Sequence, residues 1–415
     1  MLLYYRILTI FFLIISPLLL FYRIINKKED PERCLEKFGR FSKSRIKGKI
    51  IWFHGSSVGE VMSVMPLVEK LEKRKDIKQI LITSNTYSSS KILSKFKLKK
   101  TIHQFFPLDV SFIIKKFLKH WKPSIAIFIE SEIWPNAIIE IKKEKIPLIL
   151  INARITKKSF GKWVKIKSFS RFLFEKFDLC MPQNKETIKY LKVLGTKNIN
   201  KIGNLKFSES QEAKKKELNP NLQKYFTKKN IILGAISTHY SEELICAKVH
   251  MYQKKILKNL ITLIIPRHVH RSKEIVEDLK KYNLNIHLHS SKKIPKRNID
   301  IYLVDTFGET KLFTRNCSLV FLGGSLINHG GQNPLEAARA GCKILHGPYI
   351  ENFKDVYSFL SKFRISKKIT NLSQLKHEVI KNLKTKSMPK KNILKIKKIG
   401  KDILRLNYKQ ISNYL

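Results

Sequence analysis

Short apolar runs alternate with amphipathic stretches along most of this chain of 415 residues. This alternation is typical of α/β folds, in which helices connect parallel strands. In the first half we expect strands at 49–54, 79–83, 125–129 and 147–152, and helices at 60–74, 88–96 and 136–144. In the second half we expect strands at 231–236, 260–265, 299–304, 319–322 and 343–346, and helices at 241–251, 271–282, 334–340 and 352–363.

The repetition of this pattern predicts two domains, since a chain of this length exceeds one ordinary core. A charged and polar segment at 208–229 separates the halves and is predicted to be a linker. We therefore expect an N-terminal domain over 26–207 and a C-terminal domain over 230–415. Both are predicted to be doubly wound, Rossmann-like domains that face a cleft at the carboxyl ends of their strands.

The first 25 residues are predicted to be a membrane anchor. No charged residue occurs between Ile7 and Tyr22, and Met1 to Tyr5 extend the apolar run beyond Arg6. The whole reaches the roughly 20 residues that a bilayer requires. No small-residue cleavage site follows, which favours a retained transmembrane helix over a cleaved signal peptide. Positive charge follows the segment, so the positive-inside rule predicts that the rest of the chain is cytoplasmic.

The net charge of +50, from 82 Lys and Arg against 32 Asp and Glu, leaves three interpretations open. It indicates a nucleic-acid surface, a surface for anionic lipid, or a compositional bias without a partner. The basic residues are spread over the chain, which disfavours a nucleic-acid stripe. The N-terminal segment independently favours anionic membrane lipids.

The 5 cysteines are odd in number and widely spaced, without a CxxC pair. This pattern predicts unpaired thiols rather than a disulfide framework or a zinc site.

The first candidate site lies where the strand at 49–54 ends in the sequence HGSSVGE. Glycines permit a tight turn, and Glu60 falls in the first turn of the next helix. A carboxylate at such a turn, facing a cleft, is suited to act as a general base. The alternative is structural, because Ser57 and Glu60 also have the spacing of a capping box.

The second candidate site follows the strand at 125–129. Glu130 and Glu132 are two residues apart, so an extended backbone would point both carboxylates to one side. Like charges at that distance raise one pKa, and the pair could hold hydroxyls or orient a base. The alternative is that they cap the helix after Pro135.

The third candidate site is the glycine-rich sequence GGSLINHGGQNPLE after the strand at 319–322. Bare glycine backbone and the N-terminus of a helix favour an anion such as a nucleotide phosphate. Glu336, in the first turn, could accept hydrogen bonds from ribose hydroxyls. The sequence is neither a Walker loop nor a dinucleotide GxGxxG motif, and a plain turn is the alternative. Arg267 and the segment 305–309 follow other strands of the same half, so we expect them at the same rim.

These residues belong to a set of segments that resembles the 3-deoxy-D-manno-octulosonic acid (Kdo) transferases of lipopolysaccharide biosynthesis. The segments, in order from His54 to Phe353, are HGSSVGE, ESEIWPN, NARIT, GNLKF, STHYSEE, IPRH, VDTFGE, GGSLINHGGQNPLE and GPYIENF. The resemblance implies an inverting glycosyltransferase of the GT-B fold in the inner membrane. It also implies CMP-Kdo as donor, the lipid A precursor lipid IVA as acceptor, and no cofactor or metal.

The resemblance also implies roles for individual residues. Glu60 matches the proton acceptor of the family, and Glu130 and Lys206 match residues that stabilise the transition state. The positions that match CMP contacts are Pro266, Arg267, Phe307, Gly308, Glu309, Asn333, Pro334, Leu335 and Glu336. The chain departs from the family at Tyr240 and Ser241, where Glu or Gly is frequent.

Two other functions remain open at this point. Another GT-B transferase, acting with a UDP-sugar on a lipid acceptor, would share the fold, the anchor and the glycine-rich loop. A membrane-tethered nucleic-acid binder would require a clustered basic stripe with interleaved aromatic residues. The sequence has no such stripe, so no nucleic-acid partner is expected.

Overall fold

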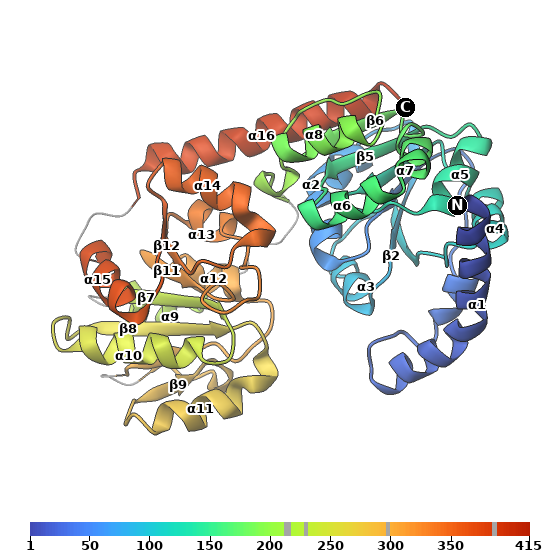
Figure 1. The fold of residues 1–415 in the computed structure, drawn as a ribbon. Coiled ribbons are helices and arrows are strands. Elements are labelled where there is room, and N and C mark those ends of the chain that lie inside the picture. Colours follow the sequence, from blue (N-terminus) through green and yellow to red (C-terminus); the bar gives the residue numbers. More distant parts are fainter. Residues whose placement is uncertain (211–216, 228–230, 296–298, 384–387) are drawn as a thin grey trace. The chain divides into compact units, whose positions relative to one another are not determined.

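The computed structural model describes residues 1–210, 217–227, 231–295, 299–383 and 388–415 (Figure 1). The chain divides into two compact units by its internal contacts. The first unit comprises residues 1–214 and 399–415, and the second comprises residues 215–398. Each unit is described by itself.

The first unit contains a sheet of 6 strands in the order β3-β2-β1-β4-β5-β6, and every adjacent pair is parallel. The strands are β1 (Lys49–His54), β2 (Ile77–Ser84), β3 (Thr101–Phe105), β4 (Ile125–Ile129), β5 (Leu148–Ala153) and β6 (Leu179–Pro182). This is the order of a doubly wound sheet with its switch point between β1 and β4. The sequence predicted four of these strands but neither edge strand.

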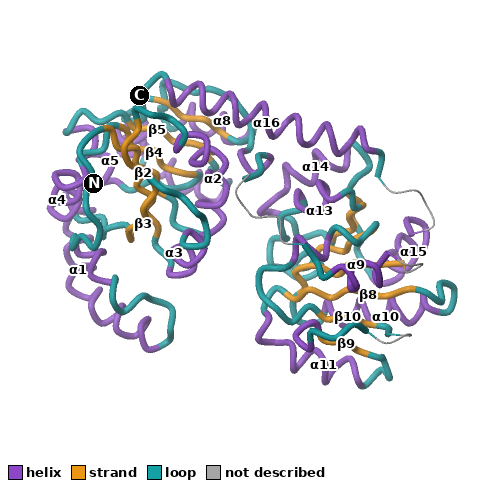
Figure 2. The backbone as a smooth tube through the Cα atoms, turned by 180° about the vertical axis from the view of Figure 1, so that it is seen from behind, coloured by secondary structure: helices purple, strands orange, loops and turns teal. Residues whose placement is uncertain are grey.

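Helices cover both faces of this sheet (Figures 1 and 2). They are α2 (Val58–Glu72), α3 (Tyr87–Leu93), α4 (Ser111–Trp121), α5 (Pro135–Lys143), α6 (Lys157–Lys165), α7 (Lys167–Phe174) and α8 (Lys185–Val193). Short 3-10 helices occur at Cys34–Phe38 and Leu205–Phe207. The core is aromatic at its centre, where Trp52 packs on Phe117 and Phe128 with ring centroids 4.9 and 5.4 Å away.

The second unit contains a parallel sheet of 7 strands in the order β13-β12-β11-β7-β8-β10-β9. The strands are β7 (Ile231–Thr238), β8 (Leu260–Pro266), β9 (Ile286–Leu288), β10 (Ile301–Leu303), β11 (Leu319–Leu322), β12 (Lys343–His346) and β13 (Ser366–Lys368). Its helices are α9 (Pro220–Thr227), α10 (Glu242–Lys254), α11 (Ser272–Lys280), α12 (Thr310–Thr314), α13 (Leu335–Ala340), α14 (Lys354–Lys362) and α15 (Leu372–Leu383). Two doubly wound Rossmann-like units therefore confirm the predicted fold class.

The C-terminal residues correct the predicted domain boundaries. Helix α16 (Lys390–Ser412) begins in the second unit, but residues 399–415, expected in the C-terminal domain, belong to the first unit. Ser208 Oγ donates a hydrogen bond to the carbonyl of Gly400 over 2.9 Å. A Cβ at Gly400 would lie 2.1 Å from the carbonyl oxygen of Phe207, so the close packing requires glycine. These contacts join segments far apart in the sequence, which explains why the sequence could not predict them.

Part of the expected linker is an ordered helix. In α9, Leu222 and Phe226 are buried, and the ring of Phe226 lies 5.1 Å from that of Tyr302 in the second unit. Residues 211–216 and 228–230 of the predicted linker lie outside the described residues. The helical part of the segment therefore contributes to the second core.

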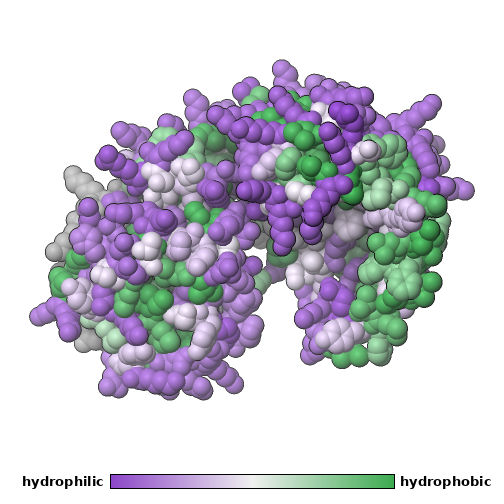
Figure 3. Space-filling view, viewed as in Figure 1, coloured by the Kyte–Doolittle hydropathy of each residue, from purple (hydrophilic) through white to green (hydrophobic). Residues whose placement is uncertain are grey.

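The N-terminal segment is a single helix, α1 (Leu2–Ile25), of 24 residues. Its length and mean hydropathy of 2.3 are sufficient for a helix that crosses a membrane. Hydrophobic side chains gather over α1 on the face of the first unit seen in Figure 3. The cysteines are all free thiols, as the spacing predicted.

Candidate active site

Glu60 lies at the start of α2, directly after the turn that ends β1. Ser57 accepts a hydrogen bond from the Glu60 amide over 3.4 Å, and the Glu60 carboxylate accepts one from the Ser57 amide over 3.0 Å. The capping box that the spacing allowed is therefore formed. It fixes the Glu60 carboxylate at the carboxyl edge of the sheet, which leaves the general-base interpretation open as well.

The surroundings of Glu60 make its carboxyl group a proton acceptor near neutral pH. Burial raises its pKa from 4.5 to about 7, and the negative charges of Glu132 and then Glu130 contribute further. The hydrogen bonds from the turn amides act in the opposite direction and are outweighed. A carboxyl group with a pKa near the working pH is well matched to general-base chemistry.

Glu132 is the fixed negative charge beside Glu60. Its Oε2 accepts hydrogen bonds from Ser56 Oγ and Trp134 Nε1, each over 2.6 Å, and lies 2.9 Å from His54 Nε2. Burial works against ionisation of Glu132, but these polar contacts, above all that of His54, outweigh it and lower its pKa. The two neighbouring carboxyl groups therefore differ: the pKa of Glu132 is lowered and that of Glu60 is raised, an arrangement that suits separate roles.

Glu130 points to different partners. Its Oε1 lies 2.7 Å from Lys206 Nζ and accepts a hydrogen bond from Asn152 Nδ2 over 3.3 Å. Asn152 Oδ1 in turn accepts a hydrogen bond from the amide of Leu205 over 3.0 Å. Asn152 therefore connects Glu130 to the 3-10 helix Leu205–Phe207, which contains Lys206. The structure thus brings Glu130 and Lys206 together although 76 residues separate them in the sequence.

The backbone explains why Glu130 and Glu132 separate. β4 ends at Ile129, and Glu130 has φ = 56°, so the backbone is not extended there. Asn152, on the neighbouring β5, has φ = 53°. Left-handed backbone is disfavoured for a residue with a side chain and is often found at functional sites. The expectation that both carboxylates point to one side is therefore wrong.

The N-terminus of α5 is capped by a residue that the sequence did not single out. Asp109 accepts hydrogen bonds from the amides of Asn136 and Ala137 over 3.0 and 2.7 Å. Since Asp109 takes this position, the structural alternative in which Glu130 or Glu132 caps α5 is wrong. Asp109 follows β3, a strand that the sequence pattern also missed.

The glycine-rich loop after β11 is organised by a buried carboxylate. Glu242, which is fully buried, accepts hydrogen bonds from the amides of His239, Gly324, Ser325 and Leu326 over 2.7–3.1 Å. A Cβ at Gly323 would lie 2.5 Å from the carbonyl oxygen of Ser237. The glycine therefore serves close packing, and these loop amides bind Glu242 rather than being presented to a phosphate, contrary to our expectation.

The residues predicted to bind CMP lie at or after the carboxyl ends of strands of the second sheet. Pro266 ends β8 and is buried, whereas Arg267 is exposed. Phe307 is 71% exposed, and Gly308 has φ = 85°. The remaining positions are Glu309, whose Oε2 lies 3.2 Å from His289 Nε2, and Asn333, Pro334, Leu335 and Glu336 at the start of α13. Because β8, β10 and β11 lie in one sheet, the structure places these segments along the same edge.

Histidines that the sequence analysis did not single out cluster at this edge. The ring of His239, just after β7, lies 4.1 Å from that of His329 and 5.6 Å from that of His268. His239 is buried, and its pKa falls to about 4 because of burial and then the charges of His329, His268, Arg267 and Arg271. Their appearance in three separate motifs, STHYSEE, IPRH and INHGG, is the sequence signal that could have identified them.

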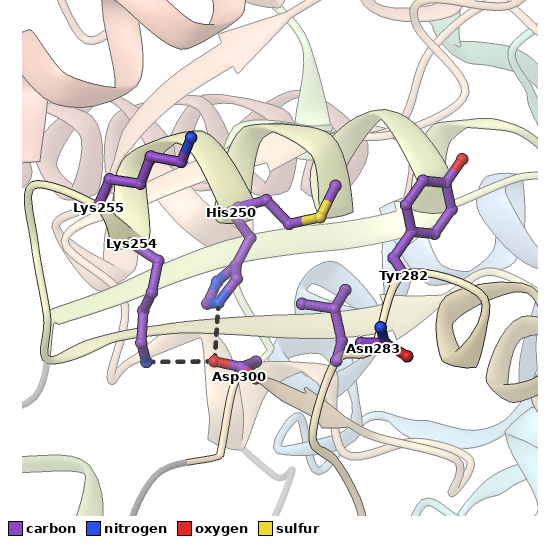
Figure 4. Close-up of a pocket in the computed structure, with 8 residues that line it drawn as sticks. His250, Lys254, Lys255, Tyr282, Asn283 and Asp300 are labelled. Carbon is purple, nitrogen blue, oxygen red and sulfur yellow. Dashed lines mark hydrogen bonds and ion pairs between the residues drawn. The ribbon is translucent and has the colours of Figure 1, made fainter.

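A pocket of the second unit lies away from these groups (Figure 4). His250 Nε2 and Lys254 Nζ lie 3.3 and 3.4 Å from Asp300 Oδ1, and Asp300 precedes β10. The pocket is therefore at the amino edge of the sheet. Asp300 also accepts a hydrogen bond from the Asn285 amide over 3.0 Å, so the cluster ties a loop to α10 and has a structural role.

Comparison with known protein families gives one family model that matches residues 32–209, that of the 3-deoxy-D-manno-octulosonic-acid transferases. The chain is 35% identical over 352 residues to a 3-deoxy-D-manno-octulosonic acid transferase of Rickettsia bellii, covering 85% of this chain and 84% of that protein. It is 29% identical over 361 residues to the transferase of the same name from Haemophilus influenzae, again covering 85% and 84%.

Solved structures with a similar fold include a UDP-GlcNAc 2-epimerase of Neisseria meningitidis bound to UDP-GlcNAc. The two structures superpose with a TM-score of 0.58 at 12% sequence identity. The match covers 87% of this chain and 100% of the epimerase chain. The glycotransferase of kitacinnamycin has a TM-score of 0.55 at 9% identity, covering 89% of this chain and 100% of its own. At such identities the likeness concerns the fold of two Rossmann-like domains alone.

Proposed function

Because this chain belongs to the family of 3-deoxy-D-manno-octulosonic acid (Kdo) transferases and is a glycosyltransferase, we propose that it transfers Kdo from CMP-Kdo to lipid IVA with inversion. The product enters lipopolysaccharide biosynthesis. The partners are CMP-Kdo, lipid IVA and anionic membrane lipids. We place the enzyme at the cytoplasmic face of the inner membrane, attached through α1.

The observation that carries the mechanism is the environment of Glu60. Its carboxyl group has a pKa of about 7, whereas its neighbour Glu132 is kept ionised by His54, Ser56 and Trp134. A sugar hydroxyl is a weak acid and needs a base that is partly deprotonated at working pH but still basic. Glu60 meets this requirement better than Glu132, whose pKa is lowered.

In the proposed step Glu60 accepts the proton of the acceptor's 6′-hydroxyl. The hydroxyl oxygen forms a bond to the anomeric carbon of Kdo, and the bond from that carbon to the CMP phosphate oxygen breaks. The electron pair leaves with CMP, so negative charge grows on the phosphate. Arg267 is exposed at the edge where we place CMP and would stabilise that charge.

Glu130 and Lys206 are assigned to stabilise the transition state. Their ion pair of 2.7 Å, fixed by Asn152, holds the ammonium group in one position before substrate arrives. A preorganised charge needs little rearrangement when the reacting centre develops charge. CMP binding is assigned to the segments after β8, β10 and β11, with Pro266, Arg267, Phe307, Gly308, Glu309, Asn333, Pro334, Leu335 and Glu336.

The role of Glu60 is tested with Glu60→Gln, which keeps the shape of the side chain but cannot accept the proton. We expect the rate of Kdo transfer to lipid IVA to fall by roughly 10²-fold or more, with CMP still protecting the protein against thermal unfolding. Glu144→Gln, which changes an exposed carboxylate at the end of α5, is the matched control and should transfer normally. Near-normal turnover of Glu60→Gln would remove Glu60 as the base.

A further inference from the structure

The first turns of α1 are bound to the body of the first unit. Tyr5 Oη donates a hydrogen bond to Asp109 Oδ2 over 2.7 Å, and Arg6 Nη2 lies 3.1 Å from Glu140 Oε1. Both carboxylates are buried. Leu2, the first residue of the helix, packs against the hydrophobic core of the unit. The amino-terminal end of α1 is therefore part of the folded unit.

This attachment continues along the helix. The residues of α1 that are buried or only partly exposed recur every three or four positions and so form one stripe. They are Leu2, Tyr5, Arg6, Thr9, Leu13, Ile15, Ser16, Leu20, Arg23 and Ile24. The stripe includes both charged residues of the helix, and Arg23 Nε lies 3.0 Å from Glu29 Oε2. One face of α1 is thus less exposed than the other, and both charged side chains pair with carboxylates of the first unit.

The opposite face is apolar and exposed, and hydrophobic side chains gather over α1 in Figure 3. The exposed large apolar residues are Leu3, Tyr4, Ile7, Leu8, Ile10, Phe11, Phe12, Ile14, Leu18, Leu19, Phe21, Tyr22 and Ile25. Exposed apolar surface of this extent marks a site of interaction with a membrane or another protein. Lys27 and Lys28 follow the helix and are exposed, which matches the anionic headgroups of a bilayer.

These contacts exclude a bilayer-crossing orientation of the same helix. At about 1.5 Å per residue, a helix of 24 residues is about 36 Å long. If it crossed the roughly 30 Å hydrocarbon core, Tyr5 and Arg6 would lie on the side opposite Arg23. Asp109 and Glu140, which belong to the folded unit, could not follow them there.

We propose that α1 does not cross the membrane but lies in its plane, on the side of the catalytic units. Its outer face enters the boundary between headgroups and acyl chains, as interfacial amphipathic helices do. Tyr5, Arg6 and Thr9, on the inner face, stay bound to Asp109, Asn136 and Glu140. The length and hydropathy of α1 would also allow it to cross a bilayer. The contacts of Tyr5 and Arg6 with the folded unit favour the in-plane orientation instead.

The position of α1 has a consequence for a lipid acceptor. Asp109 and Asn136 follow β3 and β4, at the same edge of the sheet as Glu60 and Glu130. Asn136 Nδ2 donates to Thr9 Oγ1 over 3.4 Å, so α1 contacts the beginning of α5, close to the carboxylates. A helix in the membrane plane would hold that edge at the membrane surface, where a lipid-borne hydroxyl is presented.

The proposal is tested by the side on which the N-terminus lies. A cysteine in a short uncharged extension before Met1, with Cys34→Ser, is treated with a membrane-impermeant maleimide in inverted inner-membrane vesicles and in spheroplasts. Cys34 of the parent chain is partly exposed, whereas the other cysteines are buried, so it reports the side of the first unit. We expect the extension to be labelled in the same preparation as Cys34. Labelling only in the opposite preparation would overturn the proposal.

A second measurement gives the depth of the helix in vesicles of phosphatidylethanolamine and phosphatidylglycerol. Spin labels replace Tyr4, Phe11 and Leu18, which are 73%, 60% and 73% exposed and lie on one face at intervals of seven residues. An in-plane helix places all three at similar, shallow depth. A crossing helix separates neighbouring labels by about 10 Å along the membrane normal, and that result would also refute the proposal.

Discussion

Around Glu60, each of the other carboxylates has its own neutralising partners. Glu132 contacts His54, Ser56 and Trp134, and Glu130 contacts Lys206 and Asn152. Within the described residues, the contacts that lower the pKa of the Glu60 carboxyl group are backbone hydrogen bonds from Ser57 and Ser56 in the turn. A proton therefore binds more readily to Glu60 than to Glu132, whose pKa is lowered, and Glu60 is assigned as the base.

The pH dependence of transfer follows from this assignment. A base must be deprotonated, so the rate should fall as the pH drops through about 7, the pKa of Glu60, and approach a slope of about tenfold per unit below it. Glu132→Gln removes one of the negative charges that raise this pKa, so the midpoint of the rate profile should move to lower pH. The measurement is the initial rate with saturating CMP-Kdo between pH 5 and 9.

Glu144→Gln serves again as the control for the pH profile, because Glu144 is not among the groups that shift the pKa of Glu60. A midpoint that stays in place or rises in Glu132→Gln would contradict the proposed coupling between Glu132 and Glu60.

Residue spacing identified Glu60, Glu130 and Glu132 as candidates but not their arrangement. The left-handed backbone at Glu130 turns its side chain toward Lys206, a residue from a distant loop. A residue other than glycine rarely adopts that conformation, so an extended backbone was the natural expectation. The resemblance implied that both Glu130 and Lys206 stabilise the transition state, but neither the resemblance nor a local pattern predicted that they pair.

Among the secondary-structure elements, α10 and the loop after β11 depend on one another through Glu242. The amides of Gly324, Ser325 and Leu326 donate hydrogen bonds to this carboxylate across 82–84 residues of sequence. The departure from the family at Tyr240 and Ser241 lies beside it. Ser241 has φ = 74°, a conformation that favours glycine, so the turn before α10 is made by a residue that adopts this backbone less readily.

We expect Glu242→Gln to weaken CMP binding by roughly 10-fold or more, because an amide group cannot accept from all these backbone donors and leaves buried N–H groups without partners. Calorimetric titration with CMP measures the effect. Glu274→Gln in α11 of the same unit is the control. The Glu274 side chain is exposed, and an exposed ion pair such as the one it makes with Arg271 contributes little to stability. Unchanged CMP affinity in Glu242→Gln would show that the loop does not depend on this carboxylate.

The sequence pattern predicted the long buried strands well and the short or polar ones poorly. β4 and β5 are fully buried and apolar except for Asn152 in β5, and they were predicted nearly residue by residue. β3 is partly exposed, and β13, with the sequence SKK, lies at the sheet edge. Such strands are fixed by pairing with a neighbour rather than by their own periodicity.

At the scale of the whole molecule, the two halves of the chain do not correspond to the two units. Residues 399–415 return to the first unit, where Arg74 Nη1 donates to Ser412 Oγ over 3.0 Å and Lys70 lies over the ring of Tyr408 at 4.2 Å. Composition and periodicity describe each element but not which core it joins. The doubling of the α/β pattern was therefore sufficient to predict two domains, and insufficient to predict where the last helix ends.

The most direct test of the account is the transfer reaction itself. Membranes that contain the protein are incubated with lipid IVA and labelled CMP-Kdo or, in parallel, a labelled UDP-sugar, each with and without chelator. The account predicts chelator-resistant label in the lipid with CMP-Kdo and none with the UDP-sugar. In the Glu60→Gln variant it predicts label from CMP-Kdo at a rate lower by roughly 10²-fold or more. Transfer from the UDP-sugar, or no transfer from CMP-Kdo by membranes in which the protein binds CMP, would contradict the proposed reaction.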